Sequence, residues 1–411
     1  MTEPLARRSP EAVKELETLQ QQERTAAGES PLTTEDVLRL LRDDVHGALI
    51  SSRLNEAGLD AIVANAEEDE KVVDERVKAL CDTWHLDDPT QWSRFESPAV
   101  RWGIAGICAR VEKVFASHKW GLPEFPVVGT LATGQVSAVT QNANTGVPLI
   151  LIDNGFFKFA GIMAQLAIFA PYDFKVHGQF SPATLQLVAD LAATHTVLNT
   201  CLYLFKRQTP PQFAGRVDRL QRAISTFVIA HEFGHILAGD LNAHPAVKLP
   251  GDRTPQEKEF DADKFGFIAA IESSDNGEEA LLGPFLYFTG LDLLDRAMAA
   301  FAGRVEVPIT TSDPGDYPTP PERSKKLLDW IGTMKFPPHF AAAVQDAADC
   351  CNAIGAAWNE IIPAFWEARD DLATYRPDSG GPVMLPEARA FGAVSTLWQH
   401  IQTHRANAQG T

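Results

Sequence analysis

The sequence predicts an α+β fold that is predominantly α-helical, with a small β-sheet near the middle of the chain. Apolar residues recur at helical spacing over long stretches in the first third and again after residue 322. Between them, two short apolar runs flank a turn-rich segment, which is the pattern of a β-hairpin. Hydrophobic residues make up 45% and charged residues 22%, as in globular proteins, so we expect a sizeable buried core.

The length of 411 residues suggests two or three domains. Charged residues are sparse between residues 121 and 250, which indicates that the main core lies there. We therefore expect a helical N-terminal region (1–120), a central domain (121–335) and a helical C-terminal region (336–411).

Charge and cysteine content argue against several classes of protein. The 36 basic and 54 acidic residues give a net charge of −18, which disfavours nucleic acid or an anionic lipid surface as the main partner. The five cysteines lack CxxC spacing, so no disulfide framework or cysteine zinc site is indicated, and we expect a reducing compartment.

The N-terminal residues lack the apolar stretch of a secretory signal. The longest apolar run, residues 159–170, is shorter than the about 20 residues of a membrane-spanning helix. We expect a cytoplasmic protein without a membrane anchor.

Two helices are predicted in the N-terminal third. Thr33 precedes apolar residues at helical spacing, which predicts a helix over residues 33–50. Residues 60–81 continue the helical pattern through an acidic stretch, which we interpret as a solvated helix face.

The central domain is predicted to begin with a β-hairpin. Residues 135–141 and 147–153 are apolar runs separated by the turn sequence NANTG. Pro148 cannot donate a ladder hydrogen bond, so it places the second run at a sheet edge or at a strand start. Helical patterns follow over residues 181–206 and 212–238.

The residues His231-Glu232-Phe233-Gly234-His235 lie near the end of the second of these helices and have the form HExxH. Residues in a helix advance by about 100°, so His231 and His235 lie about 40° apart on one face and can reach a single Zn²⁺. Glu232 lies beside that face, where its carboxylate can take a proton from an activated water without being a ligand. The spacing predicts two metal ligands and a general base.

A hydrolytic zinc site commonly has three protein ligands. Downstream, Thr254-Pro255-Gln256-Glu257 has the form of a capping box with proline at the first helical position, which predicts the start of another helix. Glu259 and Asp263 share one face of that helix. The same face carries Ala262 and Gly266, small residues that would allow a close approach to the first helix. Glu259 is therefore the predicted third ligand, and Asp263 the predicted acceptor for the outer N–H of a ligating histidine.

Two other residues remain possible third ligands. Asp240 and His244 follow the motif, although Asp240 is more typical of a residue that ends a helix after Gly239. The metzincin class needs a histidine where this chain has Leu241, so that class is rejected.

At this point the sequence resembles a known family. HEFGHILAGD followed by EFDAD is similar to the HExxH and ExxAD pair of gluzincin metallopeptidases, especially the family of HtpX and the CAAX prenyl proteases. The resemblance covers roughly residues 125–330 and implies a zincin-like catalytic domain within residues 121–335, flanked by the helical regions. The membrane helices of HtpX and the prenyl proteases have no counterpart here, so their membrane substrates are not carried over.

The resemblance implies a zinc-dependent peptidase, with an endopeptidase favoured, that acts on a protein or peptide substrate. Zinc would lower the pKa of a coordinated water toward about 7 and polarise the peptide carbonyl, while Glu232 moves the proton. The family commonly has a His-Pro pair before a Glu-Arg segment, and residues 317–323 (YPTPPER) are similar, with Tyr317 in place of the histidine. Tyr317 and then Arg323 are the candidate donors to the oxyanion.

The family also has Asn-Ala near an edge strand that binds the substrate main chain, and Asn142-Ala143 is similar. We therefore expect an extended substrate to add as a strand near Leu149 and Leu151. Two rival functions remain: a regulatory or interaction protein with a structural zinc site, and an enzyme that cuts one partner protein under stress or infection. A structural site would not need a base beside the metal, so Glu232 favours hydrolysis.

Overall fold

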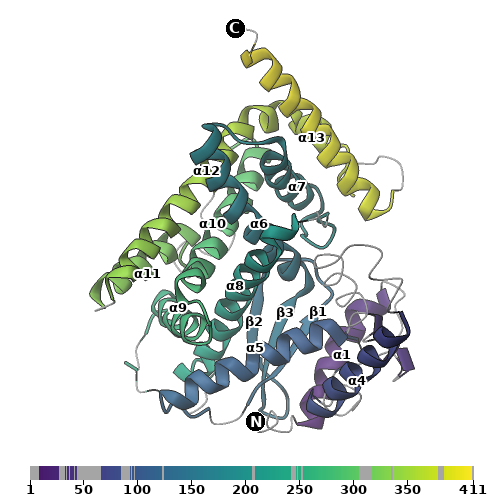
Figure 1. The fold of residues 1–411 in the computed structure, drawn as a ribbon, viewed down its shortest axis with the longest axis vertical. Helices are drawn as coiled ribbons and strands as arrows, with labels where there is room; N and C mark the ends of the chain where they lie inside the picture. The colour runs from purple at the N-terminus through teal and green to yellow at the C-terminus, as the bar shows by residue number, and fades with distance from the viewer. Residues whose placement is uncertain are drawn as a thin grey trace.

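The computed structural model describes residues 9–26, 66–84, 98–122, 125–205, 209–241, 253–304, 317–334, 337–377 and 384–409, with isolated positions between these ranges. The described chain is predominantly helical with a three-stranded sheet, which confirms the predicted α+β class (Figure 1). Its helices are α1 (Pro10–Ala26), α4 (Ala66–Trp84), α5 (Pro98–Ser117), α6 (Asn154–His177), α7 (Pro182–Leu198), α8 (Pro211–Ala238), α9 (Pro255–Glu272), α10 (Gly277–Phe301), α11 (Pro320–Thr333), α12 (Pro338–Ala373) and α13 (Pro386–Gln409).

The strands are β1 (Val127–Leu131), β2 (Ala138–Asn142) and β3 (Pro148–Asp153), in the spatial order β1-β3-β2. β2 and β3 pair antiparallel, so the predicted hairpin is confirmed, and Pro148 stands at the first position of its strand. β1 pairs parallel with the other side of β3.

The expectation of a free edge near Leu149 and Leu151 is wrong, because β3 is the central strand of the sheet. Every residue of β3 is buried, and a continuous apolar run such as VPLILID is typical of a strand covered on both faces. β2 lies at one end of the sheet, and no other described strand pairs with its outer edge.

Alternate residues of the sheet pack in opposite directions. Leu149 and Leu151 pack with Val127 against α1, where Val13 and Leu16 complete a small core. The intervening residues of β1 and β3, namely Val128, Ile150 and Ile152, belong instead to the main helical core. The sheet is therefore a layer between α1 and the helices around α8.

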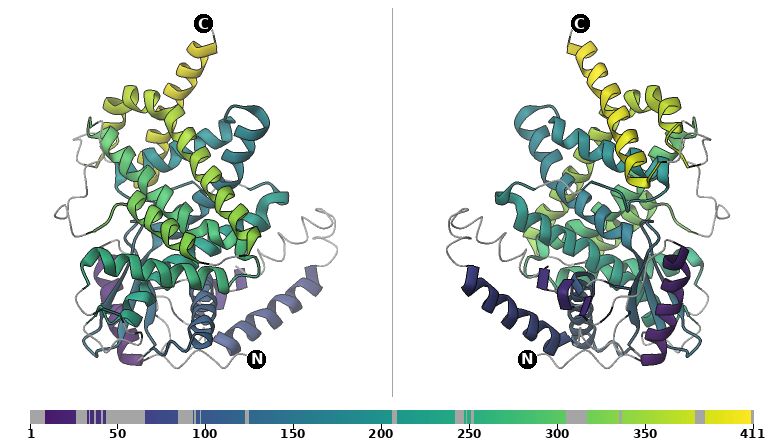
Figure 2. Two further views of the ribbon diagram at one scale, coloured as in Figure 1. Left: turned by 90° about the vertical axis from the view of Figure 1, so that its left-hand side faces the viewer. Right: turned by 90° about the vertical axis from the view of Figure 1, so that its right-hand side faces the viewer.

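The main core is continuous from Ile104 on α5 to Ile401 on α13. α8 contacts α9, α10 and α6, and α12 packs on α10, α6 and α7. α1 and α13 lie at opposite ends of the molecule (Figures 1 and 2). The division at residues 120 and 335 stays a prediction.

Some predicted helix limits differ from the structure. The helix expected over residues 181–206 ends at Leu198, because Asn199 adopts a left-handed conformation (φ 50°) and its N–H caps the carbonyl of His195. The helix expected over residues 33–50 falls largely outside the described residues. α6, which contains the apolar run at residues 159–170, is long and apolar enough to cross a membrane by length and composition alone, and 61% of its most apolar window is buried inside the protein.

Candidate metal centre

His231 and His235 lie one turn apart near the C-terminal end of α8. The helix ends at Ala238, and the next residue, Gly239, adopts a left-handed conformation (φ 74°) in which its N–H donates to the carbonyls of the last turn. Both imidazoles turn their Nε2 atoms toward the same point, and these two nitrogens lie 3.2 Å apart. Their rings are perpendicular, with centroids 4.8 Å apart.

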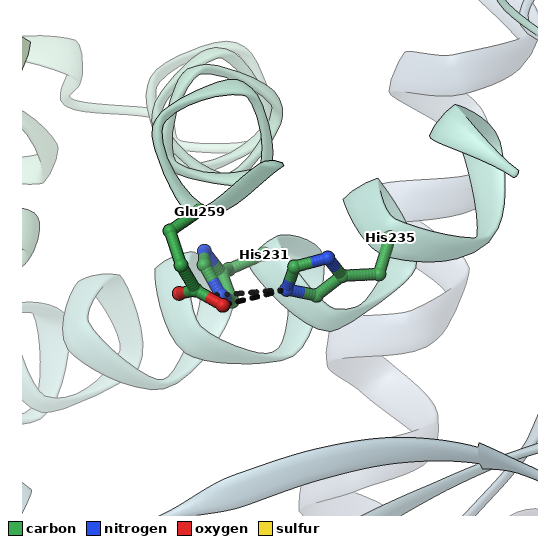
Figure 3. Close-up of side chains that lie close together, drawn as sticks. All are labelled: His231, His235 and Glu259. Atoms are coloured by element: carbon green, nitrogen blue, oxygen red, sulfur yellow. Dashed lines mark hydrogen bonds and ion pairs between the residues drawn. The ribbon is translucent and has the colours of Figure 1, made fainter. Parts of the chain in front are cut away.

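Glu259 approaches this point from α9 (Figure 3). The start of α9 is fixed by the predicted capping box, in which the side chains of Thr254 and Glu257 each accept from the other residue's backbone N–H. One Glu259 oxygen lies 3.4 Å from His231 Nε2 and the other lies 3.5 Å from His235 Nε2. The three side chains thus offer ligand atoms that all lie within 4.8 Å of one another.

The outer nitrogen of each histidine faces a carboxylate. His231 Nδ1 lies 3.0 Å from Asp263 Oδ1, and His235 Nδ1 lies 3.0 Å from Asp240 Oδ2. A carboxylate acceptor favours the tautomer with hydrogen on Nδ1 and leaves the Nε2 lone pair for a metal. Asp263 thus occupies the predicted position. Asp240 is placed behind His235 rather than among the ligand atoms, and His244 lies outside the described residues.

Arg323, on α11, contacts the carboxylates of Asp263 and Glu259. Its Nε lies 3.0 Å from Asp263 Oδ2, its Nη2 donates to Asp263 Oδ1, and its Nη1 lies 3.3 Å from Glu259 Oε2. The guanidinium is therefore engaged with the side chains that surround the ligand histidine His231, which differs from the expected role as an oxyanion donor.

Burial and the neighbouring polar groups shift the pKa values of His231 and Glu259 in opposite directions. Burial opposes protonation of His231, but hydrogen bonds with Asp263 and Glu259 outweigh it and raise its pKa to about 9. Burial would raise the pKa of Glu259, but its hydrogen bond with His231 and the charge of Arg323 hold that pKa well below the usual range. The site is thus built to keep a carboxylate ionised in a buried position.

Glu232 lies beside the ligand cluster, with Oε1 4.0 Å from His231 Nε2. Its other oxygen, Oε2, accepts a 2.6 Å hydrogen bond from the hydroxyl of Thr140 on β2. Glu232 is 6% exposed, so this carboxylate is shielded from bulk solvent although it lines the cavity.

The cluster opens into a cavity of about 590 Å³. β2 forms one wall, and Phe227, Val228 and Tyr287 supply apolar surface. Tyr317 also lines the cavity, but its side chain is 57% exposed. Tyr287, on α10, is buried among aromatic side chains, and burial raises the pKa of its phenol, which keeps the hydroxyl a hydrogen-bond donor.

Sequence reasoning missed Thr140, Tyr287 and the role of Asp240. Tyr287 stands in the apolar run PFLYF, which has the pattern of an ordinary core helix. Thr140 is separated from Glu232 by 92 residues, and no local pattern connects them. For Asp240, the sequence signal was the acidic residue immediately after the helix-ending Gly239, close to a ligand histidine.

Two imidazole nitrogens and one carboxylate oxygen are a donor set that suits Zn²⁺ and accepts other divalent ions. Within the described ranges, His231, His235 and Glu259 form the group that could hold a metal ion. Comparisons with protein-family models, with curated proteins and with solved structures find no match. The geometry and chemistry of this site are therefore the observations that bear on function.

Proposed function

We propose that this protein is a zinc-dependent peptidase of the gluzincin type, with a zincin-like catalytic core. The observation that carries the proposal is the meeting of His231, His235 and Glu259 at one point, with the carboxylate of Glu232 beside them. A structural zinc site is commonly closed by four protein ligands. Here three candidate ligands face a cavity, which favours a catalytic site over the rival structural one.

A divalent metal held by His231, His235 and Glu259 would polarise the scissile carbonyl and acidify the attacking water. Glu232 takes the proton from that water through Oε1 as the oxygen attacks the carbonyl carbon. It then returns the proton to the leaving amine when the C–N bond breaks. Asp263 and Asp240 orient the two imidazoles, and Arg323 holds Asp263 and Glu259 in place.

The substrate is a protein or peptide segment in extended conformation. β2 lines the cavity through residues 138–140, and its outer edge is not paired with another described strand. An added strand could pair there through main-chain hydrogen bonds, which accept many sequences. The outer edge of β2 thus takes the substrate-binding role that the sequence predicted for an edge at β3.

Tyr287 is the candidate donor to the oxyanion. Its side chain lines the cavity and packs among aromatic rings, whereas the guanidinium of Arg323 is already engaged. Tyr317 stays a second candidate from the rim of the cavity.

Glu232→Gln tests the hydrolytic mechanism. The amide keeps the size of the side chain but cannot act as a base, so the variant should retain zinc and lose cleavage of an unfolded protein such as reduced casein. Glu278→Gln, at the start of α10 away from the cavity, is the matched control and should cleave normally. Full activity in Glu232→Gln would refute the mechanism. Zinc binding with no cleavage by the native protein would favour the structural-site rival.

Zinc content tests the ligand set separately. Glu259→Ala removes the carboxylate of the proposed ligand set and should lower the zinc bound per chain, measured by elemental analysis after dialysis. Full zinc occupancy in this variant would exclude Glu259 as a ligand.

A further inference from the structure

Thr140 connects the general base to the strand that lines the cavity. Its Oγ1 lies 2.6 Å from Glu232 Oε2 and 3.1 Å from the backbone carbonyl oxygen of Glu232. The hydroxyl has one proton to donate. It is donated to Glu232 Oε2 rather than to the backbone carbonyl, because a hydrogen bond to a carboxylate is the stronger of the two. The side chain of one β2 residue therefore holds one specific oxygen of Glu232.

The two oxygens of Glu232 consequently have different surroundings. Oε2 is held by Thr140, and Oε1 lies 4.0 Å from His231 Nε2, on the side of the ligand cluster. The terminal torsion of a glutamate is broad and roughly two-fold, so nothing intrinsic to the side chain selects this orientation. The hydrogen bond from Thr140 supplies the selection.

The backbone of Thr140 faces the open edge of the sheet. Asp153 N donates to Ser137 O at one end of the hairpin, and Ala143 N donates to Val147 O at the other. Because hydrogen-bonded and non-bonded pairs alternate in an antiparallel ladder, residues 139 and 141 bond to β3 between these two ends. The N–H and C=O of Thr140 therefore point away from β3, toward the outer edge of β2.

We propose that Thr140 is a positioning residue that aims the Glu232 carboxylate and couples its orientation to the binding of an extended chain on β2. The proposal rests on the peptidase function proposed above. A substrate strand would hydrogen-bond to the main chain of Thr140 while the side chain of the same residue holds Oε2. Binding on the edge strand thereby fixes the residue that orients the base.

Thr140→Val is the decisive variant. Valine has the shape of threonine and favours strands, but it lacks the hydroxyl donor. Because a small misplacement of a catalytic group is costly, kcat should fall by about 10- to 100-fold, with KM for a peptide substrate and zinc content close to those of the native protein. Thr140→Ser restores the hydroxyl and should recover most of kcat. Gln141→Val, on the next residue of β2, which does not line the cavity, is the matched control and should leave kcat unchanged.

A crystal structure of Thr140→Val provides a readout that does not need activity. The Glu232 carboxylate should rotate away from the orientation with Oε1 toward His231, while the backbone of β2 stays in place. An unchanged carboxylate, or native kcat in Thr140→Val, would overturn the proposal. Loss of zinc and of thermal stability in proportion to kcat would also overturn it, because Thr140 would then only tie β2 to α8. A native protein that cleaves nothing would remove the proposed function, yet the carboxylate orientation would still decide the role of Thr140.

Discussion

At the scale of single residues, the two ring nitrogens of each candidate ligand histidine face different groups. Nε2 faces the ligand point, and Nδ1 faces Asp263 in one case and Asp240 in the other. Such partners fix the tautomer and raise the basicity of the ligand. Asp263 is 2% exposed and also binds Arg323, so it carries both functions in a buried position.

Replacing Asp263 by asparagine should weaken zinc affinity by about 10- to 100-fold, because the amide is a poorer acceptor for His231 Nδ1–H. Competition with a chromophoric chelator measures this affinity. Asp240→Asn should weaken zinc in the same direction through His235, and it serves as a second variant if burial of Arg323 beside a neutral amide prevents Asp263→Asn from folding. Asp275→Asn, at an exposed position, is the control. Native affinity in both Asp263→Asn and Asp240→Asn would contradict the assigned roles.

Tyr287→Phe tests the oxyanion donor. Loss of one such donor typically costs about 10²–10³ in kcat, and the ring itself keeps its aromatic neighbours, so folding and zinc content should persist. Tyr317→Phe is the comparison, because that hydroxyl belongs to a half-exposed side chain at the rim. A larger loss in Tyr317→Phe than in Tyr287→Phe would reverse the assignment.

The sequence could predict the residues that share one helix. Positions 231 and 235, and positions 259 and 263, have angular relations that the helix itself imposes, so their faces follow from spacing alone. Thr140 and Tyr287 could not be found in this way, because their places depend on how β2 and α10 pack on α8. The contact of Arg323 with Asp263 spans 60 residues and is likewise a product of tertiary packing.

At the scale of elements, the site requires α8 and α9 to lie very close together. A Cβ added at Gly266 would lie 2.7 Å from the carbonyl oxygen of Phe227, and one added at Gly234 would lie 3.0 Å from the Cα of Ala262. Both distances are shorter than ordinary contacts. Small residues at this crossing therefore set the separation at which Glu259 on α9 reaches the histidines on α8.

Gly266→Ala should consequently destabilise the fold by about 1–3 kcal/mol, because the added methyl group meets backbone that cannot move freely. It should also weaken zinc binding, since a displaced α9 carries Glu259 with it. Gly355→Ala on α12 is the matched control, because no atom of the described residues lies within 4 Å of its added Cβ. That control should stabilise the helix by about 0.5–1 kcal/mol. Urea unfolding with and without zinc measures both effects, and equal stabilities for the two variants would contradict the packing argument.

Sequence patterns located best the elements that have capping or turn residues at their ends. The capping box at Thr254 and the turn NANTG each marked an element that the structure contains. β1 carries no such signal, and without it β3 was expected at an edge. The pattern of apolar residues in a strand reports which faces are buried and not which edges are paired, so the order of the sheet depends on contacts between distant segments.

At the scale of the whole molecule, the net charge of −18 means that lowering the pH toward the pI near 5.0 reduces repulsion within the fold. One group on α7 acts in the opposite direction. Burial lowers the pKa of His195 to about 4, and its Nδ1 has no hydrogen-bond partner among the described residues. In the unfolded chain this histidine returns to a pKa of about 6.5. Between these two values the unfolded state binds a proton that the folded state excludes, so this group lowers the free energy of unfolding as the pH falls.

His195→Gln should remove that contribution. Relative to the native protein, its free energy of unfolding should fall less steeply with decreasing pH, by up to about 1.4 kcal/mol per pH unit between about pH 6.5 and pH 4, with no further difference in slope below that window. Urea unfolding at a series of pH values gives the slopes. His177→Gln, at an exposed position at the end of α6, removes one histidine without removing a buried one and is the matched control. Identical slopes in all three proteins would mean that His195 is protonated equally in the folded and unfolded chains, and that burial within the α7 region imposes no acid sensitivity on the fold.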